Sequence, residues 1–464
     1  MDRFADNMDA LFDPRSVAVI GASDNPGKLG FHVMKSLTKG GFAGKIIPVN
    51  PGSSEIMGLK TSPSVGRHDA SIDLAIVVVP AKLVPVVFKE CAKKGVKGII
   101  LITAGFKEID DPLGAELHEQ IAGIVNEARI PVIGPNTFGM INFHSSLNAS
   151  FTPEFSLIRK GGTCLISQSG GISHLLGFMA MRADVGFSKI VGLGNRLNVD
   201  FPHMIEYLMN DPNTKVIVIY LEGIDAPRGL IETAVKYRGK KPVIAYKSGR
   251  AAVGDQASLS HTGSMAGRHE VYTGAFSQAG ILAIDNTETL LDTAKAMAAS
   301  PIPDGPGMAV LSGQAGPGMA ACDVCEEEGL KIVRFTKKTQ QKVNDLLPPL
   351  ALRTNPVDMG PAWYDASAIE GIIRAVMHDD NVNGLLLLMM FASANADAVR
   401  GISNLLEKWA QKKPVISCIL SPPGIWDEQI GALEESGSLV NYTTPERAAR
   451  AMANLCKYGK MQIR

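Results

Sequence analysis

Short runs of apolar and β-branched residues alternate with longer amphipathic stretches from one end of this chain to the other. Repeated strand–helix units satisfy such a pattern, because each apolar run is buried as a parallel strand and each amphipathic stretch covers the sheet as a helix. The alternation therefore predicts an α/β protein built on parallel sheets. At 464 residues the chain is too long for one hydrophobic core, so we expect several domains.

The strand-like runs fall into three sets. The first lies at residues 17–21, 45–49, 74–79, 98–103 and 131–134, the second at 162–167, 190–194, 216–221, 242–246 and 281–285, and the third at 308–311, 384–390 and 414–420, ahead of a last helix from about 445 to 456. A polar segment without a pattern, 142–160, separates the first two sets, and a Pro/Gly run, 301–307, separates the last two. We therefore expect three domains, at 1–141, 142–299 and 306–464.

The bulk properties exclude several classes of partner. Lys and Arg together number 46, as do Asp and Glu, so no net field attracts nucleic acid or an anionic membrane. The longest apolar run, 385–392, is far short of the roughly 20 residues that span a bilayer. Residues 1–15 carry four aspartates and have the pattern of neither a signal peptide nor a transit peptide. We expect a cytoplasmic protein.

Six cysteines are scattered along the chain, and only Cys322 and Cys325 have a spacing suggestive of metal or redox chemistry. A single CxxC pair with no second pair is a weak signal for either. We therefore predict buried free thiols and no metal site.

The first predicted strand runs into a glycine-rich loop, from Gly21 to Gly30, and then into a predicted helix. Such a loop can hold a phosphate with its backbone N–H groups and the positive end of the helix dipole. Its spacing departs from the GxGxxG pattern of dinucleotide-binding domains, and it contains Lys28. The second strand ends at Asn50, where NAD-binding domains carry a carboxylate for the ribose. Since Asn50 and a nearby lysine do not repel a 3′-phosphate, the loop suits a phosphorylated adenosine such as coenzyme A better than NAD.

A second strand–turn–helix pattern offers another place for an anion. The strand at 162–167 ends in Ser-Gln-Ser-Gly-Gly, at 167–171, and a helix follows. An N-cap alone needs one serine, so the richer turn is predicted to hold a phosphoryl group. Glu222 follows the apolar strand at 216–221, at the edge where ligands gather in parallel sheets. Position alone fits a surface carboxylate equally well.

His261 lies in a segment of small residues, Ser-Leu-Ser-His-Thr-Gly-Ser at 258–264. This setting leaves the imidazole uncrowded and suits a histidine that presents a ring nitrogen first to one partner and then to another. Of the eight other histidines, five lie in predicted helices, where a structural or surface role is expected: His32, His118, His174, His203 and His269. If the fold brings Glu222 beside His261, the carboxylate would fix the tautomer of the ring and make its other nitrogen a better nucleophile.

With these features the chain resembles the α subunit of NDP-forming acyl-CoA synthetases of the ADP-forming acetyl-CoA synthetase type, and more distantly that of succinyl-CoA synthetase. The motifs that carry the resemblance run along nearly the whole chain: SVAVIGAS at 16–23 with Lys28 and Gly30, VPA at 79–81, ITAG at 102–105, IGPN at 133–136, SQSGG at 167–171, LEG at 221–223 and SHTG at 260–263.

The resemblance implies a Rossmann-like CoA-binding domain, a flavodoxin-like ligase domain with a phosphohistidine loop, and a second flavodoxin-like ligase domain, in that order. It implies contacts to CoA from Gly21, Ala22, Ser23, Lys28, Asn50, Pro80 and Thr103, with Asn136 near the thioester. It further implies that His261 is phosphorylated, that Glu222 steadies it, and that Ser169, Gly170 and Gly171 receive its phosphate. Ser53 and Thr137 stand where the succinate enzyme has lysine and cysteine, so the details of CoA contact differ.

The reaction that the resemblance implies converts acyl-CoA, phosphate and ADP to the acid, ATP and CoA, through acyl phosphate and phosphohistidine. In this family an ATP-grasp module, as a separate β subunit or a fused segment, holds ADP or ATP with Mg²⁺. None follows Arg464, so we expect the chain to need an ATP-grasp β subunit, in an α2β2 assembly, to make ATP.

Two alternatives of other classes stay open. The chain could be a CoA-binding sensor or an acyltransferase scaffold without ligase activity, against which His261 and Glu222 argue. It could also be an NAD(P)-dependent oxidoreductase, against which Asn50 argues.

Overall fold

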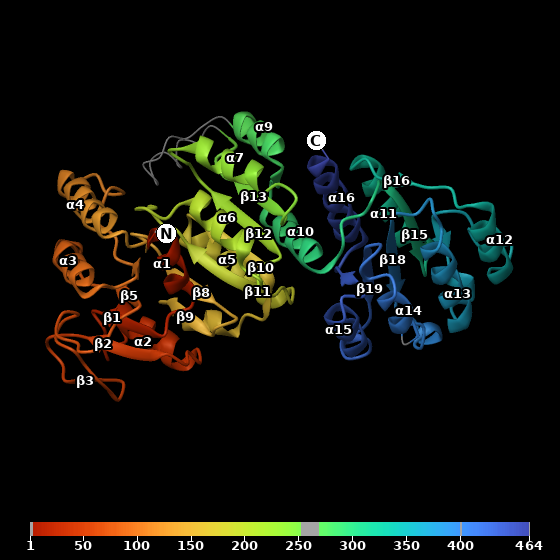
Figure 1. Ribbon diagram of the computed structural model, residues 1–464. Coiled ribbons are helices and arrows are strands. Elements are labelled where there is room, and N and C mark those ends of the chain that lie inside the picture. The colour runs from red at the N-terminus through yellow and green to blue at the C-terminus, as the bar shows by residue number, and fades with distance from the viewer. Residues whose placement is uncertain (1–2, 252–268, 400, 464) are drawn as a thin grey trace. The chain divides into compact units, whose positions relative to one another are not determined.

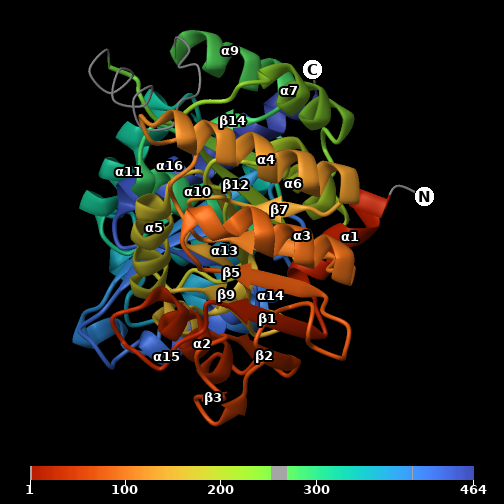
Figure 2. The ribbon, with the colours of Figure 1, turned by 90° about the vertical axis from the view of Figure 1, so that its left-hand side faces the viewer.

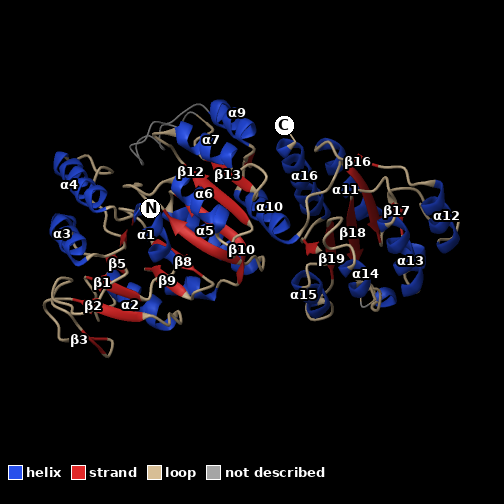
Figure 3. Ribbon diagram, viewed as in Figure 1, coloured by secondary structure: helices blue, strands red, loops and turns tan. Residues whose placement is uncertain are grey.

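The computed structural model describes residues 3–251, 269–399 and 401–463, and the chain forms two compact units, Met1–Asp285 and Asn286–Arg464 (Figure 1). Within each unit the strands lie at the centre and the helices outside (Figure 3). Each strand that the apolar runs predict is present, as are the last helix and the five helices predicted to carry histidines. The expected α/β fold with parallel sheets is confirmed.

The first sheet is parallel, with the strand order β2-β1-β5-β6-β7. Its strands are β1 (Ser16–Ile20), β2 (Lys45–Val49), β5 (Leu74–Val77), β6 (Gly98–Leu101) and β7 (Val132–Ile133), and a separate hairpin pairs β3 (Glu55–Ile56) with β4 (Leu59–Lys60). The connections reverse direction between β1 and β5. A reversal of this kind opens a crevice at the carboxyl ends of the two strands, where ligands of open α/β sheets bind.

Helices cover both faces of the first sheet. They are α1 (Arg3–Phe12), α2 (Leu29–Lys39), α3 (Val84–Lys94) and α4 (Pro112–Ala128), with the 3-10 turn η1 (Ala81–Leu83) ahead of α3. Because side chains alternate along a strand, Val17 and Val19 face the core under α2, whereas Ala18 and Ile20 face the core under α3 and α4. Figure 2 shows α3 and α4 side by side.

The second sheet has the order β14-β13-β12-β10-β11-β8-β9. Its parallel strands are β10 (Lys160–Ser167), β11 (Phe187–Gly192), β12 (Val216–Leu221), β13 (Val243–Lys247) and β14 (Leu282–Ala283), and its antiparallel edge consists of β8 (Gly139–Asn142) and β9 (Leu147–Ser150). The parallel part repeats the order of the first sheet, with the reversal between β10 and β12. The helices α5 (Gly170–Arg182), α6 (Phe201–Asn210), α7 (Pro227–Lys236) and α9 (His269–Ala279) belong to this part of the chain.

The sequence pattern missed the edge pair, because its buried side chains are partly polar. Strand β9 and the 3-10 helix η2 (Pro153–Leu157) lie in the segment 142–160, which has no apolar pattern. Asn142 is buried and donates from Nδ2 to the carbonyl of Phe12 at 2.9 Å. Asn148 is also buried and accepts from the hydroxyl of Ser150 at 2.6 Å. Hydrogen bonds of this kind offset the cost of burying an amide, so a polar strand can lie inside a sheet.

One hydrophobic core joins the two sheets of the first unit. Leu74, Ile100 and Ile133 of the first sheet belong to the same buried cluster as Ile166 and Ile219 of the second. All five side chains are completely buried. The apolar area shared in this way holds the carboxyl ends of the two sheets in a fixed relation.

The second unit has a sheet with the order β16-β15-β18-β19-β20, in which β17 also pairs with β15. Its strands are β15 (Gly307–Ser312), β16 (Lys331–Ile332), β17 (Val357–Asp358), β18 (Gly384–Met390), β19 (Val415–Leu420) and β20 (Val440–Asn441). Its helices are α10 (Thr287–Ala299), α11 (Ala315–Glu327), α12 (Lys337–Leu346), η3 (Gly360–Ala362), α13 (Ala366–Met377), η4 (Ser393–Asn395), α14 (Ser403–Glu407), α15 (Asp427–Glu435) and α16 (Pro445–Gln462). The order of the first two parallel sheets occurs here a third time.

Helix α10 precedes the Pro/Gly run 301–307 but packs on α16 of the second unit. The carboxylate of Asp292 accepts two hydrogen bonds from the guanidinium of Arg447, at 2.7 and 2.8 Å. Asn454 donates from Nδ2 to the hydroxyl of Thr293 at 2.8 Å. These paired polar groups explain why α10 belongs to the second unit.

All six cysteines are free, Cys322 half-buried and the others buried. Burial raises the pKa of the Cys91 and Cys164 thiols to about 12, so both stay protonated and unreactive at neutral pH. No helix among the described residues is long and apolar enough to cross a membrane.

Gly30 lets α2 approach the glycine loop, since a Cβ there would lie only 2.0 Å from the carbonyl oxygen of Gly21. We predict that Gly30→Ala lowers the free energy of unfolding of the first unit by about 1–3 kcal/mol, because backbone on both sides resists displacement. Gly123→Ala is the matched control, because that helical glycine has nothing within 4 Å of an added Cβ. Denaturant unfolding measures both changes, and equal midpoints for the two variants would contradict the prediction.

Candidate active site

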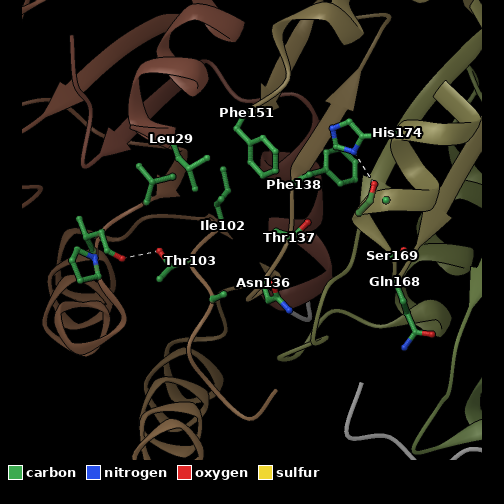
Figure 4. A pocket seen from close by; sticks show the side chains of 16 residues that line it. Leu29, Ile102, Thr103, Asn136, Thr137, Phe138, Phe151, Gln168, Ser169 and His174 are labelled. Atoms are coloured by element: carbon green, nitrogen blue, oxygen red, sulfur yellow. Dashed lines mark hydrogen bonds between the residues drawn. The ribbon is translucent and has the colours of Figure 1, made fainter. Parts of the chain in front are cut away.

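A cavity of about 680 Å³ lies where the carboxyl ends of the first two sheets meet (Figure 4). Loops of the first sheet, the segment around β8 and β9, and the start of α5 all contribute to its wall: Leu29, Val78, Val79, Pro80, Ile102, Thr103, Ala104, Asn136, Thr137, Phe138, Phe151, Gln168, Ser169, Gly170, Gly171 and His174. Of the predicted site residues, Pro80, Thr103, Asn136, Ser169, Gly170 and Gly171 are therefore brought together.

The glycine loop leaves β1 at the crevice between β1 and β5. Gly21 has a φ of +95° and donates its N–H to the carbonyl of Val49 at 3.0 Å. A Cβ at this position would lie 3.0 Å from the carbonyl oxygen of Val78, so both the backbone conformation and the space require glycine. Ala22, which follows, is completely buried.

Short-range hydrogen bonds shape the rest of this loop. The hydroxyl of Ser23 accepts from the N–H of Asn25 at 3.1 Å, and Oδ1 of Asn25 accepts from the N–H of Gly27 at 2.8 Å. Lys28 then precedes α2 with an exposed side chain. The turn at 21–23 and Lys28 lie beside Leu29, outside the lining of the cavity itself.

Asn50 ties the glycine loop to the end of β2. Its Nδ2 donates to the carbonyl of Ala22 at 2.8 Å, and its Oδ1 accepts from the N–H of Gly52 at 2.8 Å. The amide that replaces the carboxylate of NAD-binding domains therefore also fixes the loop. An acceptor-only carboxylate could not make the first of these bonds.

The wall nearest the first sheet is built from three strand ends. The hydroxyl of Thr103, after β6, donates to the carbonyl of Val79, after β5, at 2.7 Å (Figure 4). The N–H of Asn136 donates to the carbonyl of Thr103 at 3.0 Å. Asn136 has a φ of +59° and follows the cis peptide bond Gly134–Pro135. Consecutive strand ends are thus joined from Val79 to Asn136.

A segment that starts with the last residue of β11, residues 192–198, pairs with the end of the first sheet. The N–H groups of Asn195 and Leu197 donate to the carbonyls of Pro135 and Gly134, each at 2.9 Å. A Cβ on Gly194 would lie 2.2 Å from the carbonyl oxygen of Pro135. These backbone contacts join the two sheets directly beside the cavity.

Side chains of both paired segments stabilise this pairing. Asn198 accepts from the N–H of Val132 at 2.8 Å and donates to the carbonyl of Ile130 at 2.9 Å, so its amide extends the ladder of β7. The hydroxyl of Thr137 donates to the carbonyl of Gly192 at 2.6 Å. Thr137 is thus a buried structural group on the cavity wall.

The start of α5 offers backbone N–H groups to the cavity. Ser169 is the N-cap, and its hydroxyl accepts from the N–H of Ile172 at 3.3 Å. A Cβ on Gly170 would meet nothing within 4 Å, so open space lies in front of this turn. The positive end of the helix dipole and the free approach favour an anion here.

Gln168 joins this turn to Glu222. Its Oε1 accepts from the N–H groups of Glu222 and Gly223, at 2.6 and 3.2 Å, and its Nε2 donates to the carbonyl of Gly223 at 2.8 Å. Strands β10 and β12 are parallel neighbours, so Ser169 and Glu222 lie at the same edge, on the two sides of the topological reversal. Glu222 is only 8% exposed, which is unlike a surface carboxylate.

His261 lies outside the described residues, within 252–268. The chain that leads to it is anchored at this edge, because the N–H of Ser248, after β13, donates to the carbonyl of Leu221 at 3.0 Å. Beside this point Tyr220 stacks on Tyr246 with ring centroids 5.3 Å apart. Burial raises the pKa of Tyr220 to about 12, so its hydroxyl stays neutral.

The far end of the cavity is aromatic. His174 uses both ring nitrogens, because Nδ1 is 2.7 Å from the carbonyl of Gly170 and Nε2 is 2.8 Å from the hydroxyl of Thr152. The rings of Phe155 and Phe138 lie 4.8 and 5.6 Å from the imidazole, centroid to centroid. Among the described residues, none that lines the cavity carries a carboxylate, guanidinium or ammonium group. The part of the chain that the structure describes contains no cluster of His, Cys, Asp and Glu that could hold a metal ion.

Sequence reasoning gave no role to several residues of the site, among them Gln168, Phe151 and the pair formed by Glu108 and Asn195. Nδ2 of Asn195 donates to the carboxylate of Glu108, which is 87 residues earlier in the chain. Both follow strand ends, after β6 and β11. A polar residue just beyond a parallel strand was the only signal in the sequence, and it does not say which strand ends meet.

Two family models match the chain. One, described as a CoA binding domain, matches residues 15–142, and the other, described as a succinyl-CoA ligase like flavodoxin domain, matches residues 160–297.

The curated relatives include the α subunit of acetate–CoA ligase (ADP-forming) II from Pyrococcus furiosus, 36% identical, with 98% of each chain covered. Acetate–CoA ligase (ADP-forming) from Methanocaldococcus jannaschii is also 36% identical, and the match covers 97% of this chain but 63% of that one. Among solved structures, dinucleotide-forming acetyl-coenzyme A synthetase 1 from Ca. Korarchaeum cryptofilum, in complex with phosphate and ADP, superposes with a TM-score of 0.90 at 33% identity, covering 98% of this chain and 97% of that one.

We predict that Gln168→Ala lowers the free energy of unfolding by about 1–3 kcal/mol, because buried backbone groups of Glu222 and Gly223 lose their partners. Gln120→Ala, on the exposed face of α4, should change it by less than about 0.5 kcal/mol. Urea unfolding of both variants measures the difference, and a Gln168 variant as stable as the wild type would show that the amide is not needed at this edge.

Proposed function

Because the chain belongs to the family of ADP-forming acetate–CoA ligase α subunits, we propose that it catalyses the acyl-CoA, phosphohistidine and phosphate steps of an ADP-forming acyl-CoA synthetase. The overall reaction converts acyl-CoA, phosphate and ADP to the acid, ATP and CoA. The observation that carries the proposal is the cavity lined both by strand ends of the CoA-binding domain and by the start of α5. A thioester and a phosphate can meet there.

In this proposal CoA lies along the carboxyl edge of the first sheet. The turn at Gly21, Ala22 and Ser23, with Lys28, faces the phosphates, and Asn50 keeps that turn in place. Pro80 and Thr103 contact the pantetheine arm, and Asn136 lies near the thioester. The crevice between β1 and β5 and the exposed Lys28 support this arrangement. The acyl group extends toward Phe138 and His174, in the aromatic end of the cavity.

The chemistry then has three steps. A phosphate oxygen, held at Ser169, Gly170 and Gly171, attacks the thioester carbonyl carbon; the C–S bond breaks, and the CoA thiolate leaves. A ring nitrogen of His261 attacks the phosphorus of the acyl phosphate, and the carboxylate of the acid leaves. An oxygen of the β-phosphate of ADP then takes the phosphoryl group from the histidine. Glu222 orients the imidazole and stabilises its positive charge.

The final step needs a partner. The α-subunit naming of the relatives implies a β subunit. The single-chain relative from M. jannaschii is longer than this chain, which spans 63% of it. We propose that an ATP-grasp β subunit supplies the remainder in an α2β2 assembly and holds ADP or ATP with Mg²⁺. We propose the cytoplasm as its location.

We propose the domain boundaries 1–141, 142–299 and 306–464. The matches of the CoA-binding model to 15–142 and of the flavodoxin model to 160–297 support the first two. Helix α10, the last helix of the proposed second domain, packs on α16 and belongs to the second compact unit. No observation favours a CoA sensor without ligase activity.

We predict that the full chain, copurified with its β subunit, is labelled by radioactive phosphate in the presence of acetyl-CoA, and that His261→Ala abolishes the label. The alanine variant lacks the nucleophile, whereas His378→Ala, an exposed histidine of the second unit, should label normally. Autoradiography measures the outcome. Persistent labelling of the His261 variant would remove that residue from the role, and an unlabelled wild type would favour a CoA-binding sensor.

The variant Glu222→Gln, tested in the same assay, should slow labelling without abolishing it. Loss of the charge that supports the imidazole should slow labelling by about tenfold, the equivalent of one charge-assisted hydrogen bond. A labelling rate equal to that of the wild type would show that the carboxylate does not act on the histidine.

We further predict that calorimetric titration detects binding of CoA and none of NADH. Asn50 offers no carboxylate to the ribose of NADH, and its amide is bonded to Ala22. Lys28→Ala should weaken the binding of CoA, and Lys89→Ala, on exposed α3, is its control. Binding of NADH with an affinity comparable to that of CoA would contradict the assignment of the first domain to CoA.

A further inference from the structure

A chain of three side chains runs from the end of β6 to the cavity. The carboxylate of Glu108 accepts from the N–H of Gly105 at 2.6 Å and from that of Phe106 at 3.2 Å. The same carboxylate accepts from Nδ2 of Asn195. Oδ1 of Asn195 in turn accepts from Nδ2 of Asn136 at 3.4 Å. Glu108 thus holds the loop after β6 by direct hydrogen bonds. Through Asn195 it also contacts the loop that carries Asn136.

The chemistry of the carboxylate fixes the direction of every bond in this chain. A carboxylate only accepts hydrogen bonds, so Asn195 must turn its Nδ2 toward Glu108. Oδ1 of Asn195 then faces Asn136, and Asn136 must donate to it from Nδ2. The oxygen of the Asn136 amide lies on the opposite side from that nitrogen. The oxygen and nitrogen of an asparagine amide can otherwise exchange places. Here the carboxylate of Glu108, which only accepts hydrogen bonds, determines the orientation of both asparagine amides.

We infer that Glu108 is a positioning residue that acts through Asn195 to present Oδ1 of Asn136 as an acceptor for an amide N–H of the pantetheine arm. The inference rests on the proposed function, because it requires an acyl-CoA in the cavity that Asn136 lines. Pantetheine carries amide groups, and each N–H that loses water on entering a cavity needs an acceptor there. Of the three residues only Asn136 lines the cavity, so Glu108 and Asn195 act at a distance.

Two single variants and their combination test this polarity. In Glu108→Gln the side chain keeps an oxygen for Gly105 and Phe106 but turns an NH₂ group toward Asn195, which reverses both asparagines and withdraws Oδ1 of Asn136. In Asn195→Asp two carboxylates face each other. In the double variant the NH₂ group introduced at position 108 donates to the carboxylate introduced at position 195. That carboxylate also accepts from Nδ2 of Asn136, so the original polarity returns.

The readout compares two phosphoryl donors on the full chain with its β subunit. With acetyl-CoA plus radioactive phosphate, Glu108→Gln should label His261 about tenfold more slowly, because Asn136 no longer offers Oδ1 to the substrate. Asn195→Asp should also label more slowly, because repulsion between the two carboxylates moves the side chain at position 195 away from Asn136. The double variant should recover most of the rate. With acetyl phosphate labelled at phosphorus, which has no pantetheine arm, all variants should label as fast as the wild type. Glu116→Gln, on the exposed face of α4, is the control for loss of a carboxylate.

Three results would overturn the inference: a Glu108→Gln variant with the wild-type rate from acetyl-CoA, a double variant no faster than the singles, or an equal loss with both donors, which would indicate a general structural defect. A wild-type protein labelled by acetyl phosphate but not from acetyl-CoA would count against acetyl-CoA as the substrate. One labelled by neither donor would overturn the proposed function, and this inference with it.

Discussion

The candidate active site depends on the backbone pairing between the end of β7 and the segment 192–198. Asn195 and Leu197 donate to carbonyls at the end of the first sheet, and Asn198 continues the ladder with its side chain. Any side chain on Gly194 would collide with Pro135. Because this pairing joins two separately wound sheets at their carboxyl edges, strand ends of the first sheet and the start of α5 line the same cavity.

In each of the last two sheets, a glutamine side chain forms hydrogen bonds across the point where the strand order reverses. In the second sheet Gln168 bonds backbone groups of Glu222 and Gly223, after β12. In the third sheet Gln314 donates to the carbonyl of Met390 at 3.1 Å and accepts from its N–H at 3.3 Å, at the end of β18. Backbone groups beyond the last ladder bond need partners when buried, and a glutamine supplies one donor and one acceptor at once.

Much of the fold follows from the apolar runs, and the exceptions have a physical cause. The predicted parallel strands are buried on both faces, so each is a short continuous apolar run with an unambiguous signal. The edge pair β8 and β9 was missed because Asn142, Asn148 and Ser150 are buried with hydrogen-bond partners from distant or neighbouring segments. Asn50 follows β2, as the apolar run predicts, but its bond to Ala22 depends on how the loop folds.

The sequence by itself determined the α/β class, the strand ends that carry polar residues, and the family to which these motifs belong, because burial and turn chemistry are local properties of the chain. Only the tertiary structure decided that Ser169 and Glu222 share one edge through Gln168, and that Glu108 reaches Asn136 through Asn195. The hydrogen bonds that make these links join residues 54 to 87 positions apart, and no local pattern encodes which strand ends meet. That choice is made by the core shared between the sheets and by the pairing of the 192–198 segment.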